Sequence, residues 1–341
     1  MLADGELERR IAQGVRGITS NPTIFAKAMA ASDAYDAELA EAIGRGLDVE
    51  SAYWQLARSD VASAAELLAP VYESSGGADG FVSIEVDPRL AHETEATVAM
   101  GRELFGAIGR PNVMIKVPAT VEGLPAITEL IAGGVNVNVT LIFSLERHLA
   151  VMEAYLAGLE ARSAPLARVA SVASFFVSRV DSDIDGRLDD LGTAPALALR
   201  GRAAVAQARA AYANFAATFA GSRWDALAAR GAHPQRPLWA STSTKNPSYP
   251  DTLYVDSLIG PHTVNTLPDA TLDAFVDHGV AARTVDADPA EAQATLRALA
   301  DAGIDLDAVT AKLEAEGVAA FVKSLDEVFA TLQHKVDALS D

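Results

Sequence analysis

The chain has 341 residues, half of them hydrophobic, and its 27 basic and 46 acidic side chains give a net charge of −19. Such an acidic surface repels phosphate backbones, which argues against nucleic acid as a partner. Because cysteine is absent, disulfides, thiolate nucleophiles and cysteine-based metal sites are excluded. The six histidines are scattered, no apolar run reaches the roughly 18 residues of a membrane span, and residues 1–6 lack the pattern of a secretory signal. We therefore expect a cytoplasmic protein without a metal, and the sequence leaves its oligomeric state open.

Short β-branched segments alternate along the chain with long segments rich in alanine, leucine and glutamate. In chain order the sequence predicts a helix at Glu6–Ala12, a strand at Val15–Thr19, a helix at Glu50–Glu73, a strand at Phe81–Val86, a helix at Arg89–Ile108, strands at Val113–Val117 and Val135–Thr140, a helix at Leu145–Arg162, a strand at Val169–Ser174, a helix at Ala194–Ala220, strands at Pro237–Ser241 and His262–Thr266, and helices at Ala270–His278 and Val318–Leu339. This alternation predicts a parallel sheet, for which a closed α/β barrel is the commonest form at this length. No repeat or linker divides the chain, so residues 1–341 are expected to form a single domain.

The predicted strands carry polar side chains on one face, because alternate residues of a strand point to opposite sides. On this face lie Glu85 in the second strand, Lys116 in the third, and Asn138 and Thr140 in the fourth. The polar groups gather toward the carboxyl ends of the strands, where barrel enzymes place their active sites. An antiparallel sheet with one face in water would show the same alternation, but the long helices would then need another surface to pack on.

Lys116 follows the apolar segment Val113–Ile115 and precedes Val117. Burial between apolar neighbours favours the neutral amine of a lysine, and only the neutral amine can attack a carbonyl group. The pattern therefore indicates a lysine that forms a Schiff base. A strand-end lysine that reaches solvent or pairs with a carboxylate explains the same residues equally well.

Other groups near strand ends also have two interpretations. Asn21 precedes Pro22 and favours a turn that begins a helix. Glu85 is suited to act as a general base or to cap a helix. Arg179 and Lys245 follow strand ends and are either phosphate-binding cations or ordinary surface charges.

Several longer motifs occur in a characteristic order. They are GITSNPTIF (17–25), FVSIEVDPRL (81–90), VMIKVPATVEGLPAI (113–127), GVNVNVTLIFS (134–144), VASVASFFVSRVD (169–181) and LWASTSTKNPSYPDTLYVDSLIGPHTVNTLP (238–268). With these motifs the chain resembles the transaldolase family, in its longer bacterial type, over residues 6–340. The resemblance implies a TIM (β/α)8-type barrel with extra helices and with neither a metal nor an organic cofactor.

The resemblance also implies a reaction. A transaldolase transfers a dihydroxyacetone unit from sedoheptulose 7-phosphate or fructose 6-phosphate to glyceraldehyde 3-phosphate or erythrose 4-phosphate, in the non-oxidative pentose phosphate pathway. The sugar is held as a Schiff base, which Lys116 would form here. Its partners would thus be small sugar phosphates. A fructose 6-phosphate aldolase and a non-catalytic sugar-phosphate-binding barrel are the alternatives.

The family pattern assigns a role to each matching residue. Glu85 and Thr140 would orient a catalytic water, and Asn138 and Ser174 would hold hydroxyl groups of the three-carbon unit. The remaining substrate-binding positions would be pocket-lining or phosphate-binding residues, namely Thr19, Asn21, Arg179, Ser241 and Lys245.

One part of the family pattern has no counterpart in this sequence. The family's first barrel strand ends in an aspartate that removes the proton of the C4 hydroxyl, and it should precede Glu6–Ala12. Asp4 is the only nearby aspartate, and its setting between Ala3 and Gly5 is not that of a strand, so we do not transfer the role to it. Either the true start lies upstream, which we favour, or the chain is truncated and impaired in catalysis.

Overall fold

One parallel sheet forms the centre of the molecule in the computed structural model, which describes residues 5–31 and 33–340. Within these residues seven strands lie in the sheet in sequence order. They are β1 (Gly17–Thr19), β2 (Phe81–Glu85), β3 (Val113–Pro118), β4 (Val137–Ile142), β5 (Ser171–Phe176), β6 (Arg236–Ala240) and β7 (Val264–Asn265). Each predicted strand is confirmed, with ends that differ by no more than two residues. The α/β fold of TIM-barrel type is confirmed with them.

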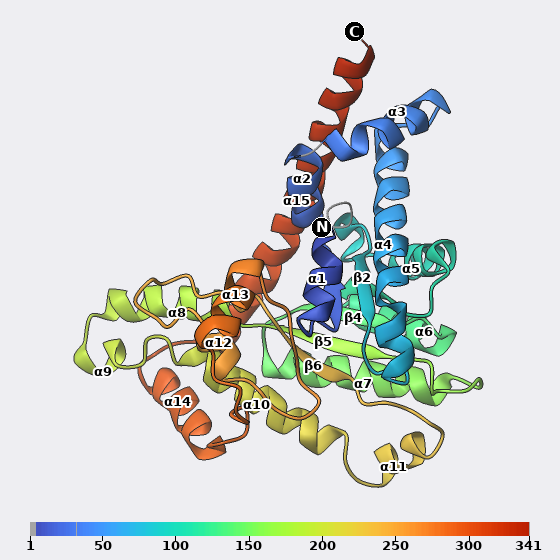
Figure 1. Ribbon diagram of the computed structural model, residues 1–341. Coiled ribbons are helices and arrows are strands. Elements are labelled where there is room, and N and C mark those ends of the chain that lie inside the picture. Colours follow the sequence, from blue (N-terminus) through green and yellow to red (C-terminus); the bar gives the residue numbers. More distant parts are fainter. Residues whose placement is uncertain (1–4, 32, 341) are drawn as a thin grey trace.

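Helices connect successive strands and cover the sheet (Figure 1). The α-helices are α1 (Glu6–Ala12), α2 (Pro22–Ala31), α3 (Asp36–Gly44), α4 (Val49–Ser74), α5 (Thr94–Ile108), α6 (Gly123–Gly133), α7 (Leu145–Ala161), α8 (Ser178–Leu191), α9 (Ala194–Leu197), α10 (Ala203–Thr218), α11 (Ser222–Ala228), α12 (Leu253–Asp256), α13 (Asp269–His278), α14 (Pro289–Asp301) and α15 (Leu306–Ser340). Two 3₁₀ turns, η1 (Asp33–Tyr35) and η2 (Pro88–Leu90), complete the list. In the described chain, no helix has the length and apolar character that crossing a membrane requires.

The central strands are buried on both faces, as parallel sheets require. All neighbouring strands pair in parallel, which rules out the antiparallel alternative. The β-branched residues on the outer face, such as Val137 and Val139, are fully buried and belong to the hydrophobic core. The inner face keeps its polar side chains, and these build the site.

The two ends of the described sheet are β1 and β7, and both strands are short and half-exposed. The helices beside them are joined by an ion pair, because the Arg10 guanidinium of α1 lies 2.5 Å from the Asp273 carboxylate of α13. Among residues 5–31 and 33–340, no strand lies on the outer side of β1 or β7. The eighth barrel strand is therefore not part of the described sheet.

Three of the predicted helices differ from the structure. The helix expected at Arg89–Ile108 begins only at Thr94, after the 3₁₀ turn η2. The expected helix Ala194–Ala220 is interrupted between α9 and α10, where Gly201 adopts a φ of 69° and donates its N–H to Asp185. The final helix begins at Leu306 rather than at Val318, so α15 is 35 residues long. In Figure 1 it is the long red helix that runs beside α2 and projects beyond the sheet.

Candidate functional site

Three predicted site residues lie side by side across the middle of the sheet. The register pairs Glu85 of β2 with Lys116 of β3, and Lys116 with Asn138 of β4. All three are buried. The parallel strands thus bring one carboxylate, one amine and one amide into a single row. Because side chains alternate along each strand, all three point to the inner face of the sheet.

The amine of Lys116 lies in a confined position with few polar neighbours. Nζ donates to the Ser20 carbonyl at 2.9 Å and lies 3.3 Å from the Glu85 carboxylate. The Lys116 and Glu85 side chains are only 7% and 4% exposed. The Phe321 ring of α15 completes the surroundings, with its centroid 5.9 Å from Nζ. The second sequence interpretation is thus half excluded: Lys116 does not reach solvent, but it does pair with a carboxylate, that of Glu85.

Burial raises the pKa of Glu85, and the nearby Lys116 ammonium only partly opposes that shift. A carboxylate with a raised pKa is a stronger base than an exposed one. Glu85 is therefore suited to accept a proton from a donor beside it.

Polar contacts connect the rest of the row. The Asn138 amide donates to the Ser83 hydroxyl at 3.0 Å and accepts from the Ser174 hydroxyl at 2.6 Å. Thr140 is buried at the end of β4, where the ladder to β5 is interrupted and Leu141 adopts a φ of 59°. Such a bulge places one extra residue at a strand end and re-aims its side chains, here at Thr140 and Leu141.

The motif after β1 approaches Lys116 through its backbone. The Thr19 hydroxyl donates to the Ser20 carbonyl at 3.4 Å, which is the same oxygen that Lys116 contacts. The Asn21 carboxamide oxygen accepts from the N–H of Ile24 at 2.9 Å, at the start of α2. The helix-entry turn predicted for Asn21 is confirmed.

A second group of predicted residues lies where β5 and β6 end. The hydroxyls of Ser178 and Ser241 are 2.9 Å apart, and Ser241 adopts a φ of 56°. Arg179 follows Ser178 and lies over the Phe176 ring at 5.5 Å. Burial lowers the pKa of its guanidinium, which Glu316 partly opposes. Arg179 forms no ion pair with any residue of the described chain, so no carboxylate there is bound directly to this partly buried cation.

Lys245 lies apart from the Lys116 row. It is exposed, its Nζ lies 2.6 Å from the Ser243 hydroxyl, and it lines a cavity of about 290 Å³. The same cavity is lined by Asp181, Asp185 and Asp189. Burial raises the pKa of Asp181 to about 6. Lys245 therefore has a more acidic environment than Arg179.

Comparison with known proteins bears directly on this arrangement. The model of the family described as transaldolase/fructose-6-phosphate aldolase matches residues 4–332. The chain belongs to this family. It is 54% identical to a transaldolase of Thermobifida fusca, over 99% of this chain and 93% of that protein. It is also 54% identical to transaldolase 1 of Streptomyces coelicolor, over 96% and 87% of the two chains, and 51% identical to a transaldolase of Frankia alni, over 98% and 92%.

Sequence reasoning missed three groups that surround the site of this transaldolase family member. Ser20 and Ser178 stand inside quoted motifs, but their contacts depend on how the strands pair. Phe321 has no motif of its own, and its apolar helical pattern predicts only core packing. Asp4 lies outside the described residues. Within the described chain, no cluster of three or more metal-binding side chains is present.

Proposed function

We propose that this chain acts as a transaldolase through a Schiff base on Lys116. Its family membership and its 54% identity to transaldolases over nearly the whole chain make it a transferase of that kind. The observation that carries the mechanism is the buried Lys116 amine beside Glu85, in the middle strands of a parallel sheet. The donor is a ketose phosphate, sedoheptulose 7-phosphate or fructose 6-phosphate, and the acceptor is glyceraldehyde 3-phosphate or erythrose 4-phosphate.

The Lys116–Glu85 pair explains how the reaction begins. Glu85 takes a proton from the ammonium, and neutral Nζ attacks C2 of the ketose. Loss of water gives an iminium ion. The C4 hydroxyl then gives up its proton, in the family to the aspartate that ends the first barrel strand, and the iminium ion accepts the electron pair of the breaking C3–C4 bond. An aldose phosphate leaves, and the dihydroxyacetone unit remains on Nζ as an enamine. It then attacks the carbonyl carbon of the acceptor aldose, and hydrolysis of the new iminium releases the product.

The surrounding residues supply positioning in this proposal. Glu85 and Thr140 orient the water that is lost and later added. Asn138 and Ser174, already joined by a hydrogen bond, exchange that contact for hydroxyls of the three-carbon unit. Thr19 and Asn21 line the pocket on the β1 side.

The phosphate group would lie at the ends of β5 and β6. Arg179 supplies the charge and Ser241 a hydroxyl, and the absence of an ion pair at Arg179 among the described residues supports this assignment. Lys245 provides a more distant cation in the same loop as Ser241. We place the reaction in the pentose phosphate pathway and in the cytoplasm, as is general for transaldolases.

Two alternatives are less well supported. A fructose 6-phosphate aldolase would release free dihydroxyacetone, but the quoted relatives are named transaldolases. A non-catalytic sugar-phosphate-binding barrel would not need a buried amine beside a carboxylate with a raised pKa.

Reductive trapping tests the central step. Incubation with fructose 6-phosphate followed by borohydride should add one three-carbon unit or one hexose phosphate to the peptide that contains Lys116. The Lys116→Ala variant should form no adduct and have no transaldolase activity. Lys323→Ala, which removes an exposed lysine of α15, is the matched control and should be trapped like the native protein. Absence of an adduct on native Lys116, or full activity of Lys116→Ala, would refute the proposal.

A further inference from the structure

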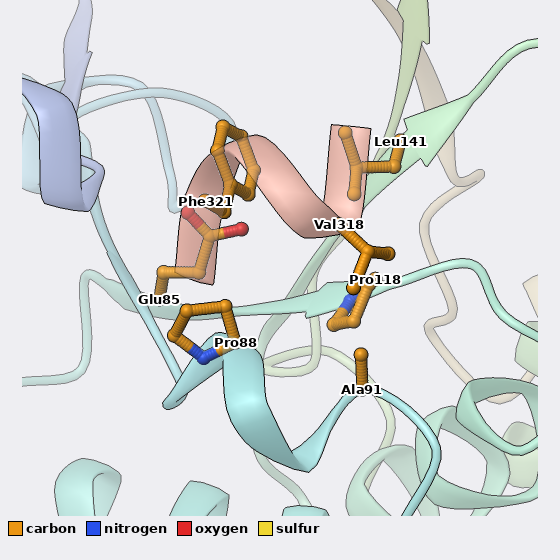
Figure 2. Close-up of a pocket in the computed structure, with 7 residues that line it drawn as sticks. All are labelled: Glu85, Pro88, Ala91, Pro118, Leu141, Val318 and Phe321. Atoms are coloured by element: carbon orange, nitrogen blue, oxygen red, sulfur yellow. The ribbon is translucent and has the colours of Figure 1, made fainter. Parts of the chain in front are cut away.

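The helix α15 crosses the carboxyl ends of the strands that hold the lysine. Its residues Val318 and Phe321 face the strand ends across a narrow space (Figure 2). The residues that line this space are Glu85, Pro88, Ala91, Pro118, Leu141, Val318 and Phe321. We call Gly317, Val318 and Phe321 the roof. In Figure 2 the carboxylate of Glu85 points toward Phe321, and Leu141 lies next to Val318.

The roof approaches the sheet closely because residue 317 is glycine. A Cβ atom at Gly317 would lie 2.8 Å from Cδ2 of Leu141, closer than real Cβ atoms come to other heavy atoms. Glycine in a helix interior costs roughly 1 kcal/mol relative to alanine. Leu141 itself adopts the left-handed backbone conformation that residues other than glycine rarely take. The helix glycine at 317 and the left-handed backbone of Leu141 are each unfavourable locally, and together they form the close contact between α15 and β4.

Polar contacts hold α15 on both sides of the roof. Toward its start, the Lys312 ammonium lies 2.5 Å from the Asp183 carboxylate of α8. Toward its end, the hydroxyls of Ser324 and Thr23 of α2 lie 2.8 Å apart. The roof is therefore a fixed part of the site and not a loosely packed helix segment.

The space under the roof is too narrow for a water molecule, and Glu85 is the only one of its seven lining residues with a polar side chain. Phe321 covers the side of Nζ that faces α15. Hydration of such a space is unfavourable because a buried water needs two to four polar partners.

Water access matters at one step in particular. The enamine on Lys116 has two fates after the first aldose phosphate has left. It attacks the acceptor aldose, or it takes a proton on carbon from a bulk water molecule to give an iminium ion, and the hydroxide that this leaves adds at C2. In the second case the C2–Nζ bond breaks, and free dihydroxyacetone and the lysine amine result. The second fate turns a transferase into an aldolase.

We propose that the roof, through Phe321 and Val318, is a specificity device that favours transfer over hydrolysis by keeping bulk water from the enamine on Lys116, while the single water oriented by Glu85 and Thr140 stays in the site. This inference rests on the proposed Schiff-base function. Phe321 acts through Lys116 and the space around it and is thus a positioning residue. Neither residue belongs to the sequence motifs that indicate the family.

The test measures how each turnover is partitioned. Native protein, Phe321→Ala and Val318→Thr are given fructose 6-phosphate and erythrose 4-phosphate, and free dihydroxyacetone and sedoheptulose 7-phosphate are quantified. The ratio of the two products should rise about tenfold in Phe321→Ala, equivalent to about 1.4 kcal/mol. It should rise less in Val318→Thr, which keeps the volume but offers water a partner. Since the ratio is a property of active molecules, partial unfolding does not change it.

Phe329→Ala is the matched control. Phe329 lies on the same helix, packs against Tyr53 with ring centroids 5.5 Å apart, and has Arg89 over its ring. The substitution weakens the packing of α15 at a site that does not contact Lys116. It should therefore leave the product ratio unchanged. An unchanged ratio in Phe321→Ala, or an equal rise in Phe329→Ala, would overturn the inference. If borohydride still traps native Lys116 in that case, only the roof is refuted; if it does not, the proposed function fails as well.

Discussion

Two lysines predicted to serve the site lie in contrasting regions of the molecule. Lys116 is buried between two paired strands, with one carboxylate at 3.3 Å, a carbonyl at 2.9 Å and the Phe321 ring 5.9 Å from Nζ. Lys245 is exposed on a loop and shares an open cavity with three aspartates. The first environment suits covalent chemistry because it shields the amine from water. The second is open to solvent, which screens a charge, so the contribution of Lys245 to the site is expected to be small.

Glu85 should have the largest effect among the neighbours of Lys116. The variant Glu85→Gln removes the base and should lower kcat by about 10²-fold or more, within the range of general acid–base catalysis. Because the pKa of Glu85 is raised, its ionised form is lost as the pH falls through that raised value. The acid limb of the native pH–rate profile should therefore lie above about pH 4.3, where an exposed glutamate titrates.

Kinetics from pH 4 to pH 9 check this expectation. The acid limb should disappear in Glu85→Gln, and the exposed Glu93→Gln should keep the native profile. If the acid limb of the pH–rate profile is unchanged in Glu85→Gln, a group other than Glu85 causes it.

Arg179 should have the next largest effect. A charge-assisted hydrogen bond contributes roughly 1.5–3 kcal/mol, so Arg179→Ala should reduce kcat/KM for erythrose 4-phosphate by about 10- to 100-fold. The comparison substrate is D-erythrose, which lacks the phosphate. For this substrate, kcat/KM of Arg179→Ala should stay close to the native value. An equal loss for both acceptors would show that Arg179 acts on the fold and not on the phosphate.

Lys245 should have the smallest effect. The variant Lys245→Ala should change kcat/KM for erythrose 4-phosphate by only about two- to threefold, because exposed ion pairs contribute about 0–1 kcal/mol. The difference from Arg179→Ala should widen as the ionic strength rises, since salt screens the exposed charge of Lys245 first and that of the partly buried Arg179 less. If Lys245→Ala lost as much kcat/KM as Arg179→Ala, Lys245 would contribute as strongly to phosphate binding as Arg179, despite its exposure.

Strand alternation was sufficient to predict most of the site from the sequence. It placed Glu85, Lys116 and Asn138 on one face, and parallel pairing then aligns them in a row. The bulge at Leu141 could not be predicted, because the strand sequence around it contains no glycine. The same holds for Phe321, whose contact with the site depends on the path of a helix that starts well before the predicted residue 318.

The position of the roof in the chain has a consequence for how the protein folds. Glu85 and Phe321 are 236 positions apart, so bringing them together costs loop-closure entropy that local contacts do not. The helices and strands from β2 to β5 have nearby partners and need no such closure. Lys116 is thus expected to reach its place in the sheet early and to be covered by α15 late, and during that interval its amine is accessible to carbonyl compounds in solution.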